Sequence, residues 1–174
     1  MLKRALVLLL VSAASLSAQQ LTAAGSARLL WKDAAHNIAE SAVDMPADKF
    51  SFRPTAGVRS FGELVAHVAG AEQMFCAIAL GEKPPAEDAV EKSATTKAAL
   101  IAALAASSSA CDRAYAQSDS ASAAAINLFG QPRTRLHALL MNATHDNEHY
   151  GNIVTYLRMN GLVPPTSKPR KPAT

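Results

Sequence analysis

The sequence predicts an all-α protein, a bundle of four helices. Alanine is abundant, aromatic residues make up only 5% of the 174 residues, and runs of β-branched residues are almost absent. Apolar residues recur at helical spacing over about 21–43, 60–80, 93–117 and 134–160, and connectors containing proline or glycine separate these segments. Four such segments without strands are typical of a four-helix bundle.

The first two helices are separated by the connector DMPADKFSFRPTAGVRS. Pro46 interrupts the chain after the first helix, whose candidate core residues are Leu29, Leu30, Ile38 and Val43. The second helix begins at a capping box, in which the side chains of Ser60 and Glu63 each bind a free backbone amide of the first turn. It ends near Gly81, and its apolar stripe is expected to contain Leu64, His67, Val68, Met74 and Ile78.

The last two helices follow from the same kind of evidence. The connector GEKPPAED precedes the third helix, whose larger apolar residues are Leu100, Leu104 and Tyr115. The stretch NLFGQPRT leads into the fourth helix, and Gly161 with the two prolines that follow it is a typical helix end.

Residues 1–18 are predicted to be a secretory signal peptide. Lys3 and Arg4 precede an apolar run, and small residues lead to Ala18, the expected last residue before cleavage. The run is too short to span about 30 Å of hydrocarbon, and we expect no later membrane-spanning helix. The mature protein is therefore expected to be periplasmic or secreted, with no stable membrane insertion after cleavage.

The rest of the chain is predicted to form one domain, 19–165, followed by a disordered basic tail, 166–174. The net charge of +3 falls to +1 once Lys3 and Arg4 are removed, and without the three basic residues of the tail SKPRKPAT the body, with 12 basic and 14 acidic residues, is slightly acidic. The body of the protein has no basic face, so we expect no nucleic-acid partner.

The stretch THDNEHYGN carries the chemistry of the fourth helix. His145 and His149 stand four residues apart, so their side chains share one helix face. Two imidazoles hold a metal weakly, and in a bundle the third ligand comes from a facing helix. The candidate is His67, on the apolar stripe of the second helix. His137, rotated about 80° from His145, and His36, in a polar run, are predicted to lie at the surface.

The same stretch spells H-x-x-E-H, the pattern of inverzincin proteases. Such a protease needs an acidic ligand further along the chain, and no Asp or Glu follows His149, so we interpret the match as accidental. Glu148 points about 80° off the bisector of the histidine pair. It is predicted to be a solvent-exposed carboxylate, with a role as base or hydrogen-bond partner of the site as the alternative.

Three further polar residues of the fourth helix are candidates for the surroundings of the site. Asn142 and Asn152 each lie about 40° from the bisector of the histidine pair, within reach of a ligand imidazole or a metal-bound water. Tyr156, one turn beyond Asn152, either lines a cavity or packs in the core.

A bundle with one histidine on its second helix and H-x-x-x-H on its fourth, followed by YLRMNGLVPP, resembles the DinB/YfiT-like family of metal-binding bundles. The likeness covers about 21–165 and implies that His67, His145 and His149 bind one divalent metal, with solvent in the other positions. It also implies an up-down-down-up order, with the third helix parallel to the second. Many members read H-R-G-Q after the last ligand, where this chain has His149-Tyr150-Gly151-Asn152, so their substrate preference does not transfer.

Three neutral imidazoles leave coordination positions open, which is typical of a catalytic metal. We expect zinc or nickel first, with iron, manganese or copper as alternatives, since imidazole suits several of these ions. Relatives of this fold include thiol-dependent transferases and isomerases, but an exported protein meets little cytosolic thiol, so metal-assisted hydrolysis fits better. A non-catalytic, stress-related metal-binding bundle stays open. The expected partners are the metal ion and an unidentified small molecule, and a homodimer is left open.

The two cysteines test the helix order. Cys76 and Cys111 lie about 24–27 Å into their helices, so they stand at the same level only if these helices run parallel, as the resemblance implies. A disulfide then requires Cα atoms within about 7 Å. We expect two free, buried thiols, with a disulfide as the alternative that export would permit.

Overall fold

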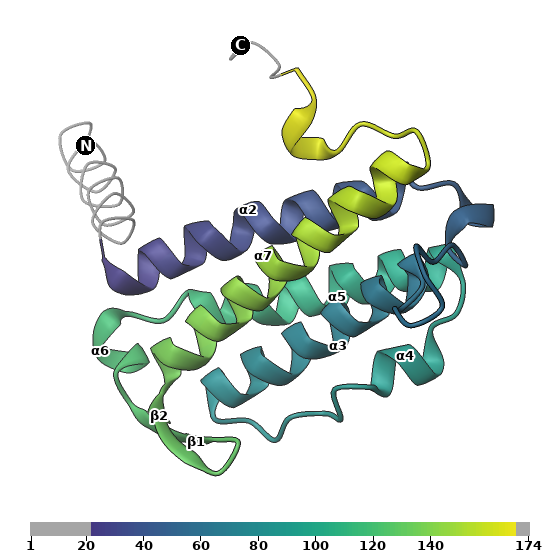
Figure 1. Cartoon of the computed structure of the whole chain (residues 1–174). Helices are drawn as coiled ribbons and strands as arrows, with labels where there is room; N and C mark the ends of the chain where they lie inside the picture. The colour runs from purple at the N-terminus through teal and green to yellow at the C-terminus, as the bar shows by residue number, and fades with distance from the viewer. Residues whose placement is uncertain (1–21, 170–174) are drawn as a thin grey trace, which may run out of the picture.

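The computed structural model describes residues 22–169, which form a bundle of four long helices (Figure 1). The long helices are α2 (Ala23–Asp44), α3 (Phe61–Leu80), α5 (Lys97–Tyr115) and α7 (Arg135–Met159). The shorter elements between and after them are η1 (Ala47–Lys49), α4 (Ala89–Ser93), α6 (Asp119–Ser122), β1 (Ala125–Leu128), β2 (Gln131–Thr134) and η2 (Pro165–Ser167). The predicted all-α class and the four-helix architecture are confirmed.

The long helices run up, down, down and up, as predicted. Lys97, at the start of α5, donates to two carbonyl oxygens at the end of α2, so these two helices are antiparallel. Gly62 and Leu100 meet near the starts of α3 and α5, and Cys76 and Cys111 meet near their ends, so this pair is parallel. The connector that contains α4 therefore returns along the bundle (Figure 1).

The ends of α3 follow the sequence signals closely. The Glu63 amide donates to Ser60 Oγ at 3.2 Å, and the Ser60 amide donates to Glu63 Oε2 at 2.8 Å, which confirms the capping box. Gly81 ends the helix with a left-handed φ of 76°, a conformation that glycine adopts without a steric penalty. Both signals are local, which is why they are legible in the sequence.

The predicted core is correct for α3 and α5 and partly wrong for α2. Ile38 is fully buried, but Leu29, Leu30 and Val43 are 47%, 54% and 57% exposed. The buried stripe of α2 runs through small residues and one large anchor, Trp31, at helical spacing. A stripe rich in alanine gives a weak hydrophobic signal in the sequence. The larger leucines beside it were therefore predicted to be the core residues. The stripe includes Ala24, Ala27, Trp31, Ala34, Ile38 and Ala42.

Cys76 and Cys111 form a disulfide between α3 and α5, so the prediction of free thiols is wrong. Their Cα atoms lie 5.1 Å apart, within the range that a disulfide requires. Buried alanines around the pair, at 71, 79 and 114, belong to the same core cluster and let the two helices approach closely. The helix order placed the cysteines at one level, but only the packing distance decided that they bond.

The stretch NLFGQPRT contains a hairpin that the prediction of no strands missed. β1 and β2 pair antiparallel, with Leu128 opposite Gln131. Phe129 and Gly130, the two turn residues between them, have φ values of 53° and 79°. Positive φ at both positions is typical of a tight two-residue hairpin turn, which is usually marked by Asn-Gly rather than Phe-Gly.

The predicted disordered tail is ordered where the structure describes it. Residues 165–167 form η2, and Lys168 Nζ lies 2.6 Å from both Glu40 Oε1 and Asp44 Oδ2 on α2. The expectation of disorder is therefore wrong for 166–169, because two carboxylates of α2 hold the lysine. Residues 170–174 and the predicted signal peptide, 1–18, lie outside the described residues.

One described helix, α3, is long and apolar enough to cross a membrane by length and composition, contrary to the expectation from the sequence. It is also the most enclosed helix of the bundle, and 72% of its most apolar window is buried. Its apolar character is accounted for by its packing against α5 and α7.

Candidate metal centre

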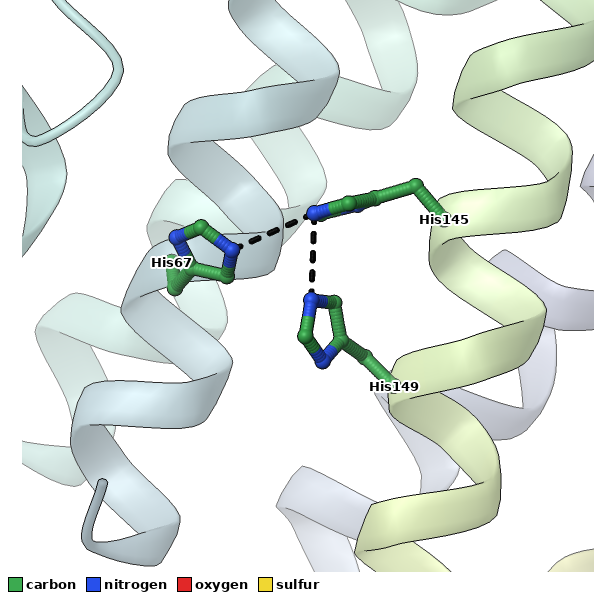
Figure 2. Close-up of side chains that lie close together, drawn as sticks. All are labelled: His67, His145 and His149. Carbon is green, nitrogen blue, oxygen red and sulfur yellow. Dashed lines mark hydrogen bonds between the residues drawn. The ribbon is translucent and has the colours of Figure 1, made fainter. Parts of the chain in front are cut away.

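α3 and α7 bring His67, His145 and His149 together in the middle of the bundle (Figure 2). His145 Nε2 lies 3.2 Å from His67 Nε2 and 3.1 Å from His149 Nε2. The three potential ligand atoms lie within 4.8 Å of one another, a spacing that fits one ion bound at about 2.0–2.2 Å. The predicted convergence of these side chains, called here the histidine cluster, is confirmed.

Helix geometry accounts for the cluster. His145 and His149 are one turn apart on α7 and project from the same face toward α3 (Figure 2). His67 lies on the buried face of α3 and is only 8% exposed. Because α3 and α7 run antiparallel and pack in contact, the single histidine of one helix faces the pair on the other.

The imidazoles of the cluster favour their neutral form. Burial lowers the pKa of His67 and His145 below the usual value. For His149, burial and the two neighbouring histidines lower the pKa to about 4. At neutral pH all three rings therefore keep a nitrogen lone pair available, which is the state in which imidazole binds a metal.

The outer nitrogen of His67 contacts carboxylates from the crossover connector. His67 Nδ1 lies 3.1 Å from Oε1 of Glu91, in α4, and 3.6 Å from Oε1 of Glu87. An Nδ1–H that donates to Glu91 fixes the tautomer whose Nε2 lone pair faces the other histidines. Sequence reasoning missed both carboxylates. The only signal was their i, i+4 spacing in a connector whose path was not known.

The other two histidines also have an oxygen-bearing side chain near Nδ1. His145 Nδ1 lies 3.7 Å from Oδ1 of Asp146, and His149 Nδ1 lies 3.4 Å from the side-chain amide of Asn152. A half-turn of that amide presents its oxygen to an Nδ1–H. The predicted contact between Asn152 and a candidate ligand is therefore present. His67 is the ring whose Nδ1 lies within hydrogen-bond distance of a carboxylate, whereas His145 Nδ1 is buried without a hydrogen-bond partner.

The remaining candidates take other places. Asn142 is buried and donates to the hydroxyl of Tyr115 at 3.2 Å, so it does not contact an imidazole as predicted. Tyr156 donates to the backbone oxygen of Arg59 at 2.6 Å and lines a cavity beside His149. Glu148 is exposed, as the preferred interpretation had it, and so are His36 and His137.

A second polar group lies beside the histidine cluster and was not predicted. Glu72 Oε1 accepts from Trp31 Nε1 at 2.7 Å, and its other oxygen accepts from the hydroxyl of Ser107. Asp146 is fully buried next to it. Burial raises the pKa of both carboxyls, and the charge of Asp146 raises that of Glu72 further. Glu72, Asp146, Trp31 and Ser107 are together called here the carboxyl cluster.

A cavity of about 500 Å³ adjoins the histidine cluster. It opens between α7 and the connector that precedes α3, and a volume of this order suits a small molecule. His149 forms part of its wall, so a molecule in the cavity contacts the edge of the histidine cluster. Other residues of the wall are Arg59, Leu64, Asn152, Thr155 and Tyr156.

Comparison with solved structures shows what this fold resembles. A DinB-like protein from Bacillus cereus ATCC 10987 is 18% identical, with a TM-score of 0.68 over 78% of this chain and 91% of that chain. A DinB-like protein from Bacillus subtilis is 20% identical, with a TM-score of 0.66 over 84% of this chain and 99% of that chain.

An enzyme shares the fold as well. The mycothiol-dependent maleylpyruvate isomerase is 17% identical, with a TM-score of 0.63 over 75% of this chain and 60% of that chain. At this identity the likeness shows a common fold. No curated protein matches the sequence. Residues 30–153 match the family model of the DinB superfamily, and the chain belongs to that superfamily.

Proposed function

We propose that this protein binds one divalent transition metal through Nε2 of His67, His145 and His149 and uses it in a hydrolase-type reaction on a small molecule. The observation that carries the proposal is the convergence of three neutral imidazoles within 4.8 Å. Three protein ligands leave coordination positions for a substrate, as in catalytic rather than structural sites. Zinc or nickel is the first expectation for the metal, with iron, manganese and copper as alternatives.

The bound ion would supply Lewis-acid chemistry, and the protein would supply position and access. Glu91 holds the tautomer of His67 that directs Nε2 inward. The cavity beside His149 admits a small molecule to one side of the histidine cluster. Tyr156, held by the backbone of Arg59, gives that cavity a fixed wall.

We also propose that the protein acts outside the cytoplasm, in the periplasm or after secretion. The disulfide between Cys76 and Cys111 supports this, because such bonds persist in oxidising compartments. The compartment favours hydrolysis over thiol transfer. Intact-mass measurement on protein from the native host is expected to find a chain that begins near Gln19, whereas a full-length cytosolic species would contradict export.

A thiol-dependent transferase or isomerase is the second candidate. The observation that favours it is the structural likeness to an isomerase that depends on mycothiol. A protein found full-length in the cytosol would make this candidate the stronger one, because low-molecular-weight thiols are abundant there.

Elemental analysis of protein purified from its own compartment tests the metal. We expect about one transition-metal ion per chain in the wild type. His67→Ala should abolish stoichiometric metal binding. The helicity measured by circular dichroism should not change, because His67 lies at the edge of the site, where a cavity adjoins it. The matched control is His137→Ala, which removes an exposed histidine of α7. Full metal content in His67→Ala would contradict the proposal.

A substrate screen tests catalysis. The metal-loaded protein is expected to hydrolyse members of a panel of small esters, amides and lactones, and His145→Ala should lose that turnover. A protein that binds metal stoichiometrically and converts no member, with or without added thiol, would instead be the non-catalytic metal-binding bundle.

A further inference from the structure

The cavity beside His149 has an unbalanced charge. Among the described residues that line it, Arg59 is the only one with a permanent charge, and no carboxylate forms part of the wall. The rest of the wall combines apolar side chains, such as Val58 and Leu64, with neutral polar ones, such as Asn152 and Thr155. A positive charge in a cavity wall that has no carboxylate of its own favours an anionic ligand.

The backbone of Arg59 is held in place, and its guanidinium is only partly engaged. Its carbonyl oxygen accepts from the Tyr156 hydroxyl at 2.6 Å, which ties this residue to α7. Its guanidinium, 44% exposed, makes two long contacts of 3.4 Å to Glu91 through Nε and Nη2. A guanidinium carries five N–H donors, so donors remain for a ligand.

Arg59 is also close to the histidine cluster. It lines both the cavity beside His149 and a smaller one beside His67. A molecule bound to the guanidinium therefore lies beside His149 or His67 rather than at a remote surface.

We propose that Arg59 binds a carboxylate of the substrate, so that this cavity selects small organic acids and places the rest of the molecule against the histidine cluster. The planar fork of arginine matches the two oxygens of a carboxylate. The proposal deepens the proposed function of the same site. Binding of the acid requires the cavity and Arg59, whereas its conversion requires the metal as well.

The contact between Arg59 and Glu91 gives a competing explanation, in which Arg59 only positions Glu91 and thereby His67. The two explanations differ in what they predict for Glu91→Gln. If Arg59 binds substrate, this change releases the guanidinium and strengthens the binding of a carboxylate. If Arg59 only positions Glu91, the change leaves carboxylate binding as it was; metal binding is expected to weaken in either case, because Glu91 itself contacts His67.

The test uses the whole mature protein without metal. Two matched pairs of probes are titrated into it and followed by NMR: benzoate with benzamide, and 3-phenylpropionate with its amide. We expect each acid to bind at least about ten-fold more tightly than its amide and to shift the signals of Asn152 and Thr155. Arg59→Gln should remove that preference, Arg59→Lys should keep part of it, and Glu91→Gln should increase it. The control is Arg113→Gln, at an exposed arginine paired with Glu82 at 3.3 Å.

Metal content measured on the same variants separates this proposal from the proposed function. Arg59→Gln is expected to keep stoichiometric metal and its melting temperature while losing the preference for acids. The proposal is overturned if the wild type shows no such preference, or if Arg59→Gln retains it. If the wild type binds no metal, the proposed function fails, and the comparison of acid with amide still decides the role of Arg59.

Discussion

The histidine cluster and the carboxyl cluster lie side by side between the same two helices, yet they differ in access to solvent. Glu72 lies five residues after His67 on α3, and Asp146 directly follows His145 on α7. His149 borders the cavity of about 500 Å³ and His67 a smaller one, and each outer nitrogen of the three rings lies near an oxygen-bearing side chain. The carboxyls are sealed, with Glu72 and Asp146 only 1% and 0% exposed.

The difference shows what decides the role of a polar residue on a buried helix face. A neutral imidazole at the wall of a cavity keeps its lone pair for a ligand. A carboxyl that is closed off from water is costly in its charged form, so it is retained as a protonated or hydrogen-bonded group. The first arrangement can exchange a metal or substrate, whereas the second is placed to support the fold. Four changes test this distinction.

The largest expected effect is on stability, from Glu72→Ala. This change leaves Trp31 Nε1 without its acceptor, leaves the Ser107 hydroxyl with the Leu104 carbonyl alone, and creates a void beside Asp146. We expect a loss of about 3–5 kcal/mol in the free energy of unfolding, measured with urea, because one member of a buried polar group is removed. Metal affinity of the folded protein should change little. The control, Glu82→Ala, removes an exposed glutamate and should cost less than about 1 kcal/mol.

The disulfide, like the carboxyl cluster, is expected to affect stability rather than metal binding. Cys76 and Cys111 close a loop of 35 residues, and Cys111 Sγ lies 3.4 Å from the backbone oxygen of Glu72. Replacing both by alanine should lower the free energy of unfolding by about 3–4 kcal/mol, chiefly because the unfolded chain gains freedom. Metal stoichiometry should stay at the wild-type value. A double variant that loses its metal while still folded would show that the two clusters are coupled.

The carboxyl cluster should also make stability depend on pH. Burial and the charge of Asp146 raise the pKa of Glu72 from 4.5 to about 8, so the folded state holds a proton that the unfolded state has released in this range. Stability is therefore greatest below pH 4.5 as far as this group is concerned, and it falls as the pH rises toward 8, by up to about 1.4 kcal/mol per pH unit.

Glu72→Gln tests this sign, because it keeps an acceptor for Trp31 and cannot ionise. Urea unfolding at a series of pH values should show a flatter dependence and a variant that is more stable than the wild type near pH 8. A wild type whose stability rises steadily across this range, with the variant parallel to it, would show that the carboxyl cluster is ionised in the folded protein.

The smallest expected effect is on metal affinity, from Glu91→Gln. The change weakens the acceptor that holds the Nδ1–H of His67 without removing a ligand. We expect a 10- to 100-fold loss of affinity, about 1.4–2.7 kcal/mol, measured by competition with a chelating dye at neutral pH. Asp88→Asn, at an exposed neighbour in the same connector, is the control. Equal affinities for the two variants would assign the orientation of His67 to packing alone.

Much of the fold was predictable because its signals are local. Helical spacing of apolar residues, the capping box of Ser60 and Glu63, and the glycine after α3 each act within a few residues of chain. The i, i+4 pair of His145 and His149 is of the same kind. His67 was chosen as the third histidine because it lies on the apolar stripe of its helix, whereas the helix order came from the resemblance to the DinB/YfiT-like family.

What the sequence could not decide are the contacts that depend on how the helices are rotated and how closely they pack. These contacts are the disulfide, the burial of Trp31 in place of Leu29 and Leu30, the carboxyl cluster, and the approach of Glu91 to His67. A helix period fixes which residues share a face, but not the distance to the facing helix or the path of a connector. Those are set by the packing of the whole bundle, because each contact is formed by residues far apart in the chain.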